Sequence, residues 1–378
     1  MMAKKICLVA NYDWVIYNFR LPLVDFLIEQ GLEVILICPP GEYSDRFLEG
    51  GYQWEPWTLN RRSTAPWREL TSIQDLVRIY RSLKPDLVHH ITIKPIFYGS
   101  LAAKRAGIPR VINNFTGLGY LFSGAKSAAF LRFLVLPVLR AVLPDQRNHT
   151  VLLNENDLQQ LRKYHLIDPS QTIIIPGDGV DLARFSPPDE NELRSEPPIV
   201  IMAARLLWDK GVAEYVEAAR LVKDSDKSIR FLLAGEPDPG NPSCIPDHVL
   251  EEWRLEGMVE LLGHREDMPD ILRNATAAVL PSYHEGLPMF LLEAAASGLP
   301  LIASDIPGNR LVVKDMLNGI LIPLKNSQAL AQAISQILNE KSNRIKMGQE
   351  SRLLVEKKFS LEVVLEEFRN LYHKIGVL

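Results

Sequence analysis

The sequence alternates short apolar runs, rich in β-branched residues, with amphipathic helical stretches, and this rhythm limits the fold more than any other feature. In the first half, the expected strands are Lys5–Ala10, Glu33–Cys38, Leu87–Ile91, Arg110–Asn113, Thr150–Leu153 and Thr172–Ile175. The helical stretches between them include Arg20–Gln30, Thr71–Leu83 and Ile96–Ala106. Strands that alternate with helices predict a parallel sheet covered by helices on both faces.

The same rhythm starts again after a proline-rich, charged segment. The expected strands of this second series are Ile199–Ala203, Ile229–Ala234, Val259–Leu262, Ala277–Leu280, Leu301–Ala303 and Gly319–Ile322. A chain of 378 residues suits two domains of ordinary size. We therefore expect an α/β protein of two Rossmann-like, doubly wound domains that face a central cleft. The predicted domains are residues 1–180 and 199–360, with a linker at 181–198 and a C-terminal helix, 361–378, that packs back on the first domain.

The amino-acid composition limits the cellular compartment and the kinds of partner that we expect for this protein. The three cysteines, Cys7, Cys38 and Cys244, lack metal-ligand spacing, which favours a reducing compartment. Because no apolar run is long enough to span a bilayer, we expect a cytoplasmic protein, soluble or held at the inner face of the membrane. The net charge of −4 argues against a nucleic-acid partner. Residues 1–180 nevertheless carry a net +4, which fits an anionic membrane surface and equally fits ordinary surface scatter.

The most specific motif runs from Pro281 to Pro300 and carries two glutamates, Glu285 and Glu293, eight positions apart. A strand ends at Leu280, a loop follows through Gly286 and Leu287, and a helix begins at Pro288 or Met289. The free N–H groups at such a helix start attract phosphate. Because a carboxylate accepts hydroxyl hydrogen bonds well, the two glutamates suit a sugar and a ribose on either side of a diphosphate.

A second motif, Arg205 and Lys210, follows the first strand of the second domain. An arginine fork and a lysine point charge can clamp a diphosphate and neutralise a leaving nucleoside diphosphate. On its own, this spacing is commonplace and describes surface charge equally well. Gly235 and Gly263 each follow a strand of the same domain and are further candidates for donor binding, although plain turns explain them as well.

Three residues of the first domain are weaker candidates. Arg20 opens the first helix and is expected to meet the donor diphosphate or to lie on the surface. His90 and Lys94 follow the strand Leu87–Ile91, where they are candidates for orienting the acceptor or the donor sugar; a histidine beside a strand is also often structural. The apolar stretch 120–143, with spaced basic residues, is either a helix in a membrane interface or a core-facing helix.

No metal site and no cofactor are expected. The pair Asp224 and Asp226 resembles a metal-binding Asp-x-Asp, but it lies in a helix-to-strand turn, opposite the ligand end of a doubly wound domain. The sequence also lacks a histidine metal motif, a nucleophile elbow and a phosphate-binding Walker loop.

Taken together, these motifs resemble family 4 of the retaining glycosyltransferases, whose fold type is GT-B. The likeness covers nearly the whole chain and is strongest from Ile199 to Pro300. The runs Pro198–Arg205 and Asn241–Cys244 are similar to those of bacterial transferases that extend undecaprenyl-diphosphate-linked sugars. One departure is the loop Asn11–Asp13, where many members of the family have glycines.

The resemblance implies a role for each motif residue. Arg205 and Lys210 would bind the diphosphate, Glu285 the transferred sugar and Glu293 the ribose. The donor would be a UDP-linked nucleotide sugar, and the acceptor a polyprenyl-diphosphate-linked saccharide. Two alternatives stay open: a sugar-nucleotide epimerase of the same architecture, and a non-catalytic sugar-nucleotide-binding subunit of a transferase complex.

Overall fold

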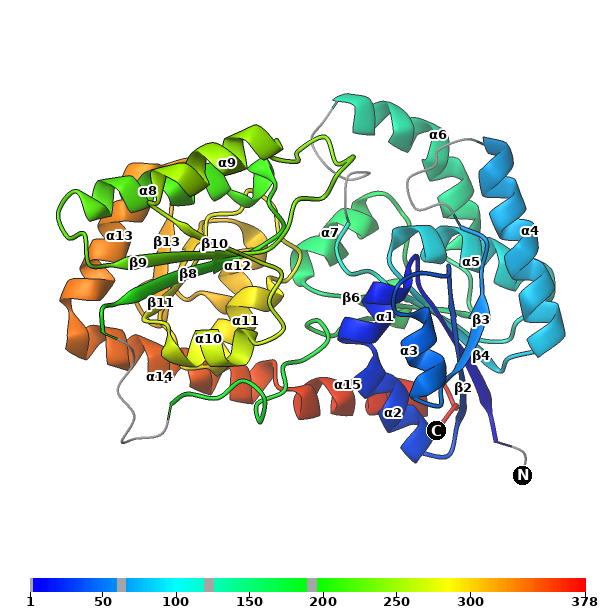
Figure 1. Cartoon of the computed structure of the whole chain (residues 1–378). Coiled ribbons are helices and arrows are strands. Elements are labelled where there is room, and N and C mark those ends of the chain that lie inside the picture. The colour runs from blue at the N-terminus through cyan, green and yellow to red at the C-terminus, as the bar shows by residue number, and fades with distance from the viewer. Residues whose placement is uncertain (1–2, 60–65, 119–125, 189–195) are drawn as a thin grey trace. The chain divides into compact units, whose positions relative to one another are not determined.

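The computed structural model describes residues 3–59, 66–118, 126–188 and 196–378. The chain forms two compact units, residues 1–178 with 364–378 and residues 179–363. Each unit contains one parallel sheet between layers of helices (Figure 1). The expected fold class, two doubly wound parallel-sheet domains of the GT-B type, is confirmed.

The N-terminal unit contains a seven-stranded sheet in the order β3-β2-β1-β4-β5-β6-β7. Its strands are β1 (Lys5–Val9), β2 (Glu33–Cys38), β3 (Gln53–Pro56), β4 (Leu87–Ile91), β5 (Val111–Asn114), β6 (Asn148–Leu152) and β7 (Thr172–Ile174). Its helices are α1 (Asp13–Phe19), α2 (Leu21–Glu29), α3 (Ser44–Glu49), α4 (Pro66–Leu83), α5 (Ile93–Ala106), α6 (Lys126–Val142), α7 (Glu155–Lys163), the 3-10 turn η2 (Pro169–Gln171) and the last helix α15 (Leu361–Lys374).

Both faces of this sheet are covered, which explains the uninterrupted apolar strands. In β1, Ile6 and Leu8 pack beneath α1, α2 and α15. The alternate residues Cys7 and Val9 pack beneath α4 and α5 on the opposite face. The C-terminal helix α15 contributes a buried stripe to the first of these cores, consisting of Val364, Phe368, Leu371 and Tyr372.

The C-terminal unit contains a six-stranded sheet in the order β10-β9-β8-β11-β12-β13. Its strands are β8 (Ile199–Ala203), β9 (Arg230–Ala234), β10 (Glu260–Gly263), β11 (Ala277–Leu280), β12 (Leu301–Ser304) and β13 (Gly319–Ile322). Its helices are the 3-10 turn η3 (Trp208–Lys210), α8 (Val212–Lys223), α9 (Asp247–Glu256), α10 (Met268–Asn274), α11 (Met289–Ala296), α12 (Pro307–Val312), α13 (Ser327–Asn339) and α14 (Lys341–Lys358).

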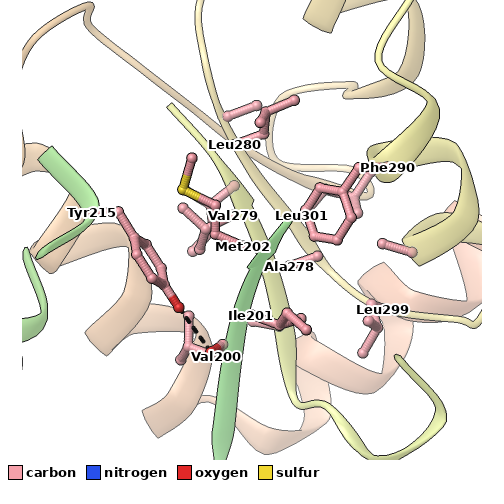
Figure 2. Packing of buried hydrophobic residues seen from close by; sticks show 14 of the residues in the cluster. Val200, Ile201, Met202, Tyr215, Ala278, Val279, Leu280, Phe290, Leu299 and Leu301 are labelled. Carbon is pink, nitrogen blue, oxygen red and sulfur yellow. Dashed lines mark hydrogen bonds between the residues drawn. The ribbon is translucent and has the colours of Figure 1, made fainter. Parts of the chain in front are cut away.

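The core of this unit lies on both faces of the two central strands, β8 and β11. Figure 2 shows how their side chains interdigitate with Tyr215 of α8 and Phe290 of α11. The buried hydroxyl of Tyr215 lies 2.9 Å from the carbonyl oxygens of Val200 and Leu232, so its polar end is satisfied. This packing fixes the strand ends from which the motif loops emerge.

The described parts of the segment expected as a linker, residues 181–188 and 196–198, belong to the C-terminal unit. Phe185 is 6% exposed and belongs to the hydrophobic core of that unit. This buried aromatic side chain therefore attaches residues 181–188 to the C-terminal unit. Among the described helices, none combines the length and apolarity that a membrane crossing requires.

Candidate active site

The two motif loops of the C-terminal unit leave neighbouring strands at the point where the strand order reverses. β8 pairs with β9 on one side and with β11 on the other. In an open α/β sheet, ligands bind at the carboxyl ends of the strands on either side of this reversal. Arg205 and Lys210 follow β8, whereas Glu285 follows β11. The topology thus brings both motifs to the position where this fold binds ligands.

Backbone contacts join the two loops. The N–H of Tyr283 donates to the carbonyl of Asp209 over 2.8 Å. A Cβ atom at Gly211, which has a φ of +75°, would lie 2.2 Å from the carbonyl oxygen of Pro281. Only glycine fits there, so the start of α8 packs directly against the loop after β11. Gly211 is a site residue that the sequence reasoning missed; its position just after Lys210 was the available signal.

Lys210 and Glu285 form an ion pair across this junction, with the ammonium nitrogen 2.7 Å from Oε1. Their side chains are only 18% and 13% exposed. The sequence assigned one residue to phosphate and the other to a sugar, yet here they bind each other. An ammonium group has three donors, so Lys210 retains donors for a phosphate while it positions Glu285.

Arg205 forms a second ion pair, with Asp238 in the loop after β9, at 2.7 Å. The arginine side chain is 52% exposed, so most of its five-donor fork is open to a ligand. Asp238 also accepts from the side-chain amide of Asn241 at 3.3 Å. Asp238 was not among the predicted site residues, because nothing in its local sequence marks it as the partner of an arginine on another loop.

Glu293 lies on the second turn of α11, whose first residue follows the buried Pro288. Burial raises the pKa of the Glu293 carboxyl from 4.5 to about 7, and the guanidinium of Arg184 partly offsets this increase. A carboxyl with this pKa is a candidate functional group, because ionisation needs a compensating hydrogen-bond donor. The hydroxyls of a ribose would supply such donors.

The loop that carries Glu285, Gly286 and Leu287 is supported from behind by α12. A Cβ atom at Gly308, on the first turn of α12, would lie 2.2 Å from the carbonyl oxygen of Glu285. The hydroxyl of Ser304 donates to the carbonyl of Ser282 at the start of the same loop. Gly286 and Leu287 remain half-buried, so they are accessible at the edge of the loop.

Gly235 follows β9, and Gly263 is the last residue of β10; the N–H of Gly235 donates to the carbonyl of Gly263 over 2.8 Å. A Cβ atom at Gly235, with a φ of +133°, would lie 1.9 Å from the carbonyl oxygen of Ala204. Gly235 thus lets the chain pass directly against the residue before Arg205. At Gly263, which has a φ of +67°, a Cβ atom would have nothing within 4 Å.

In the N-terminal unit, Arg20 is buried rather than presented to a ligand. Its side chain is 1% exposed, and its terminal nitrogen lies 2.7 Å from the carboxylate of Asp178. When the amide of Asn114 is oriented for hydrogen bonding, its oxygen accepts from both terminal nitrogens at 3.1 Å. The expected contact of Arg20 with a diphosphate is therefore corrected: the guanidinium is enclosed by partners distant in sequence.

His90 is likewise a core residue. It is completely buried, with Nε2 2.9 Å from the hydroxyl of Tyr80 and Nδ1 2.9 Å from the side-chain oxygen of Asn113. Burial lowers the pKa of its imidazole to about 4. Because both ring nitrogens are occupied and no surface is exposed, the sugar-orienting role expected for His90 is replaced by a structural one.

Lys94 remains accessible at 22% exposure, on the first turn of α5. Its ammonium lies 3.3 Å from a carboxylate oxygen of Glu69 and 5.9 Å from the ring centre of Tyr98. Two polar atoms of this unit were not anticipated: the side-chain oxygens of Asn11 and Thr92 are buried and have no hydrogen-bond partner among the described residues. Both follow strands at the reversal point between β1 and β4.

Two remaining sequence predictions concern metal ligands and the stretch 120–143. Within the described ranges, no group of three or more His, Cys, Asp or Glu side chains is arranged to hold a metal ion. Residues 120–125 lie outside the described residues, and most of the remaining stretch forms α6, with Pro137 inside the helix.

Two family models match the chain. One, described as glycosyl transferases group 1, matches residues 185–354, and the other, described as glycosyl transferase 4-like, matches residues 5–142. A relative from Campylobacter jejuni, N,N'-diacetylbacillosaminyl-diphospho-undecaprenol alpha-1,3-N-acetylgalactosaminyltransferase, is 31% identical over 88% of this chain and 89% of its own length. The chain belongs to the group 1 glycosyltransferases. It is an enzyme of glycosyl transfer, as the sequence motifs predicted.

Other relatives support the same assignment. An Escherichia coli protein named UDP-Gal:alpha-D-GlcNAc-diphosphoundecaprenol alpha-1,3-galactosyltransferase is 28% identical over 81% of this chain and 79% of its own length. Among solved structures, sucrose-phosphate synthase from Thermosynechococcus elongatus superposes with a TM-score of 0.78 at 20% identity, over 98% of this chain and 99% of that one. Anabaena HepE in complex with UDP and glucose gives 0.76 at 16% identity, over 97% and 99%. These two structures establish likeness of fold.

Proposed function

We propose that this glycosyltransferase moves a hexose or N-acetylhexosamine from a UDP-sugar to a polyprenyl-diphosphate-linked saccharide, in the assembly of a surface polysaccharide or glycan. The main support for the donor site is that the two motif loops meet beside the reversal of strand order between β8 and β11. Lys210 and Glu285 form an ion pair across this junction. The names of the two bacterial relatives, which specify diphospho-undecaprenol-linked acceptors, support the lipid-linked acceptor.

In this proposal, fixed cations do the work of a metal ion. Arg205 and Lys210 bind the donor diphosphate and neutralise the negative charge that develops as UDP leaves. The N-terminus of α11 adds its free N–H groups to the same anion. Gly235 and Gly263 allow backbone to lie close to the nucleotide, with Gly286, Leu287 and Pro288 along the donor. Transfer therefore requires no divalent cation.

The two glutamates hold the sugars at opposite ends of the diphosphate. Glu293 accepts hydrogen bonds from the ribose hydroxyls, which compensates the ionisation of its buried carboxyl. Glu285 accepts from the hydroxyls of the transferred sugar and is kept in place by Lys210. The sugar keeps its anomeric configuration because the acceptor attacks from the side of the departing phosphate, and a phosphate oxygen takes the acceptor proton. In the N-terminal unit, Lys94 is the accessible candidate for orienting the substrate.

The test of the donor site is calorimetric titration with UDP of the wild type, Lys210→Ala and the matched control Lys227→Ala. Lys227 is exposed and lies in the turn between α8 and β9, away from the β8–β11 reversal. A hydrogen bond to a charged group contributes about 1.5–3 kcal/mol, so Lys210→Ala should weaken binding by roughly 10- to 150-fold. Unchanged affinity in Lys210→Ala would remove the diphosphate site from this loop.

Transfer itself is tested with labelled UDP-sugars and a lipid extract. Product formation, with the anomeric configuration of the donor preserved in its NMR spectrum, supports the enzymatic proposal. Glu285→Gln should abolish most transfer while leaving UDP affinity within a few-fold, because that residue is assigned to the sugar. Tight UDP binding without transfer from any UDP-sugar would instead favour a nucleotide-binding subunit.

A further inference from the structure

The charges of the N-terminal unit are segregated between the two helical layers of its sheet. The described residues 66–118 and 126–147, which include α4, α5 and α6, contain 12 Lys and Arg but only 4 Asp and Glu. Residues 13–49, which form α1, α2 and α3 on the other face, contain 7 Asp and Glu and 2 Arg. The net +4 of residues 1–180 thus conceals a strongly basic side and an acidic side.

The basic layer has a groove of about 550 Å³ along α4. Its apolar residues are Leu70, which is 51% exposed, with Ile73 and Val77 at its base. Three arginines border it: Arg78 and Arg81 on α4, and Arg105 on the last turn of α5. An apolar floor with cationic edges is complementary to an anionic amphiphile, which has both kinds of surface.

α6 continues the same layer next to α5 (Figure 1). The ammonium of Lys104, at the end of α5, donates to the carbonyl of Ala141 in α6 over 3.2 Å. α6 buries Leu139 against the unit but exposes Phe133 by 75% and Val138 by 49%. Large apolar side chains at the surface of a basic helical layer are typical of segments that lie in a membrane interface.

We propose that the outer face of the α4–α5–α6 layer docks on a bilayer that contains anionic phospholipid, with lipid headgroups at the arginine-lined groove and Phe133 in the headgroup region. The inference rests on the proposed function only in that a polyprenyl-linked acceptor lies in such a bilayer. The acidic opposite face and the net −8 of residues 181–378 would be repelled by the same surface, so the charge distribution also sets the orientation of the unit.

The test is sedimentation of the full-length protein with vesicles of phosphatidylcholine alone or with 30% phosphatidylglycerol. The wild type should bind only the anionic vesicles, and less tightly as salt increases. Each basic residue near such a surface contributes roughly fivefold in partitioning, about 1 kcal/mol. Arg81→Gln with Arg105→Gln should therefore lose roughly 25-fold, and Arg81→Glu with Arg105→Glu should lose more. Phe133→Ser should weaken binding independently of salt.

The matched control is Lys227→Glu with Arg254→Glu, two exposed basic residues of the C-terminal unit. This variant should bind vesicles as the wild type does. All variants should keep the thermal midpoint and UDP affinity of the wild type, which separates loss of the docking face from loss of the fold or of the donor site.

Four results would overturn the inference, and the last of them is absence of any vesicle binding. The first is binding to phosphatidylcholine vesicles that equals binding to anionic vesicles. The second is equal loss in the control and in the Arg81 and Arg105 variants. The third is a dimer in sedimentation velocity that Phe133→Ser converts to monomer without any change in vesicle binding, because the exposed face would then pair two copies. Absence of vesicle binding with intact UDP affinity would reject this surface and leave the donor site standing.

Discussion

The buried carboxyl of Glu293 should make the free energy of unfolding depend on pH. Its pKa in the folded chain is about 7, against an ordinary value of 4.5, because burial disfavours the charged form. Between these two pH values the folded chain holds a proton that the unfolded chain has released. The free energy of unfolding therefore falls as pH rises through this window and reaches its full loss, about 3 kcal/mol, above pH 7.

Glu293→Gln removes the ionisable carboxyl, so the variant should not lose unfolding free energy as the pH rises. We expect the variant to match the wild type near pH 4 and to exceed it by up to about 3 kcal/mol at pH 8. Hydrogen exchange of the β8 and β11 amides, read by mass spectrometry and corrected for intrinsic rates, reports the stability of the C-terminal unit itself. Glu252→Gln, at an exposed position of α9, is the matched control and should show no such difference.

The same substitution should impair function while it stabilises the fold. A ribose hydroxyl donates more strongly to a carboxylate than to a neutral carboxyl. UDP-sugar affinity of the wild type should therefore rise as pH increases through about 7, whereas that of Glu293→Gln should be weaker and free of this step. If Glu293→Gln were less stable than the wild type at pH 8, or equally altered at pH 4 and pH 8, ionisation of the buried Glu293 carboxyl would not be what lowers stability.

Further predictions concern a glycine of the site, the buried His90 and divalent cations. Gly235→Ala should destabilise the protein and weaken UDP binding, because its Cβ would lie 1.9 Å from a backbone carbonyl of the loop after β8. The control for stability is Gly263→Ala, where a Cβ meets no neighbouring atom. It should lower the free energy of unfolding by only about 1–2 kcal/mol, the cost of backbone strain, in thermal unfolding. His90→Ala should lower the free energy of unfolding by about 2 kcal/mol or more but leave UDP affinity unchanged; weaker UDP binding would contradict its structural role. His90 should also make the wild type lose stability as pH falls from 6.5 towards 4, the opposite sign to Glu293, and the variant should lack this loss. Transfer activity should survive EDTA, and its abolition, reversed by a divalent ion, would show that fixed cations are not sufficient.

Where strands are buried on both faces, the sequence reasoning located them closely. Leu87–Ile91 and Ala277–Leu280 are strands with those same bounds, because a continuous apolar run between loop residues leaves few alternatives. The edge strand β3, Gln53–Pro56, was missed, since its exposed residues show no apolar signal. The helix α4 begins at Pro66 rather than Thr71, because its first turn lacks the apolar periodicity on which the prediction depended.

Some features of the candidate site could likewise be predicted from the sequence, whereas others could not. Lys210 and Glu285 follow strands that the apolar runs identify, so topology alone brings their loops together. Their direct pairing was not predictable, because it depends on the close approach that Gly211 allows. Arg20 appeared to be a free cation, since its carboxylate partner, Asp178, lies at the far end of the N-terminal unit in sequence.

A crystal structure with a non-hydrolysable UDP-sugar would show the donor contacts themselves. We expect the diphosphate within hydrogen-bond distance of Arg205 and Lys210, the ribose on Glu293 and the sugar on Glu285. A diphosphate bound elsewhere, with these four side chains intact and unoccupied, would contradict this expectation.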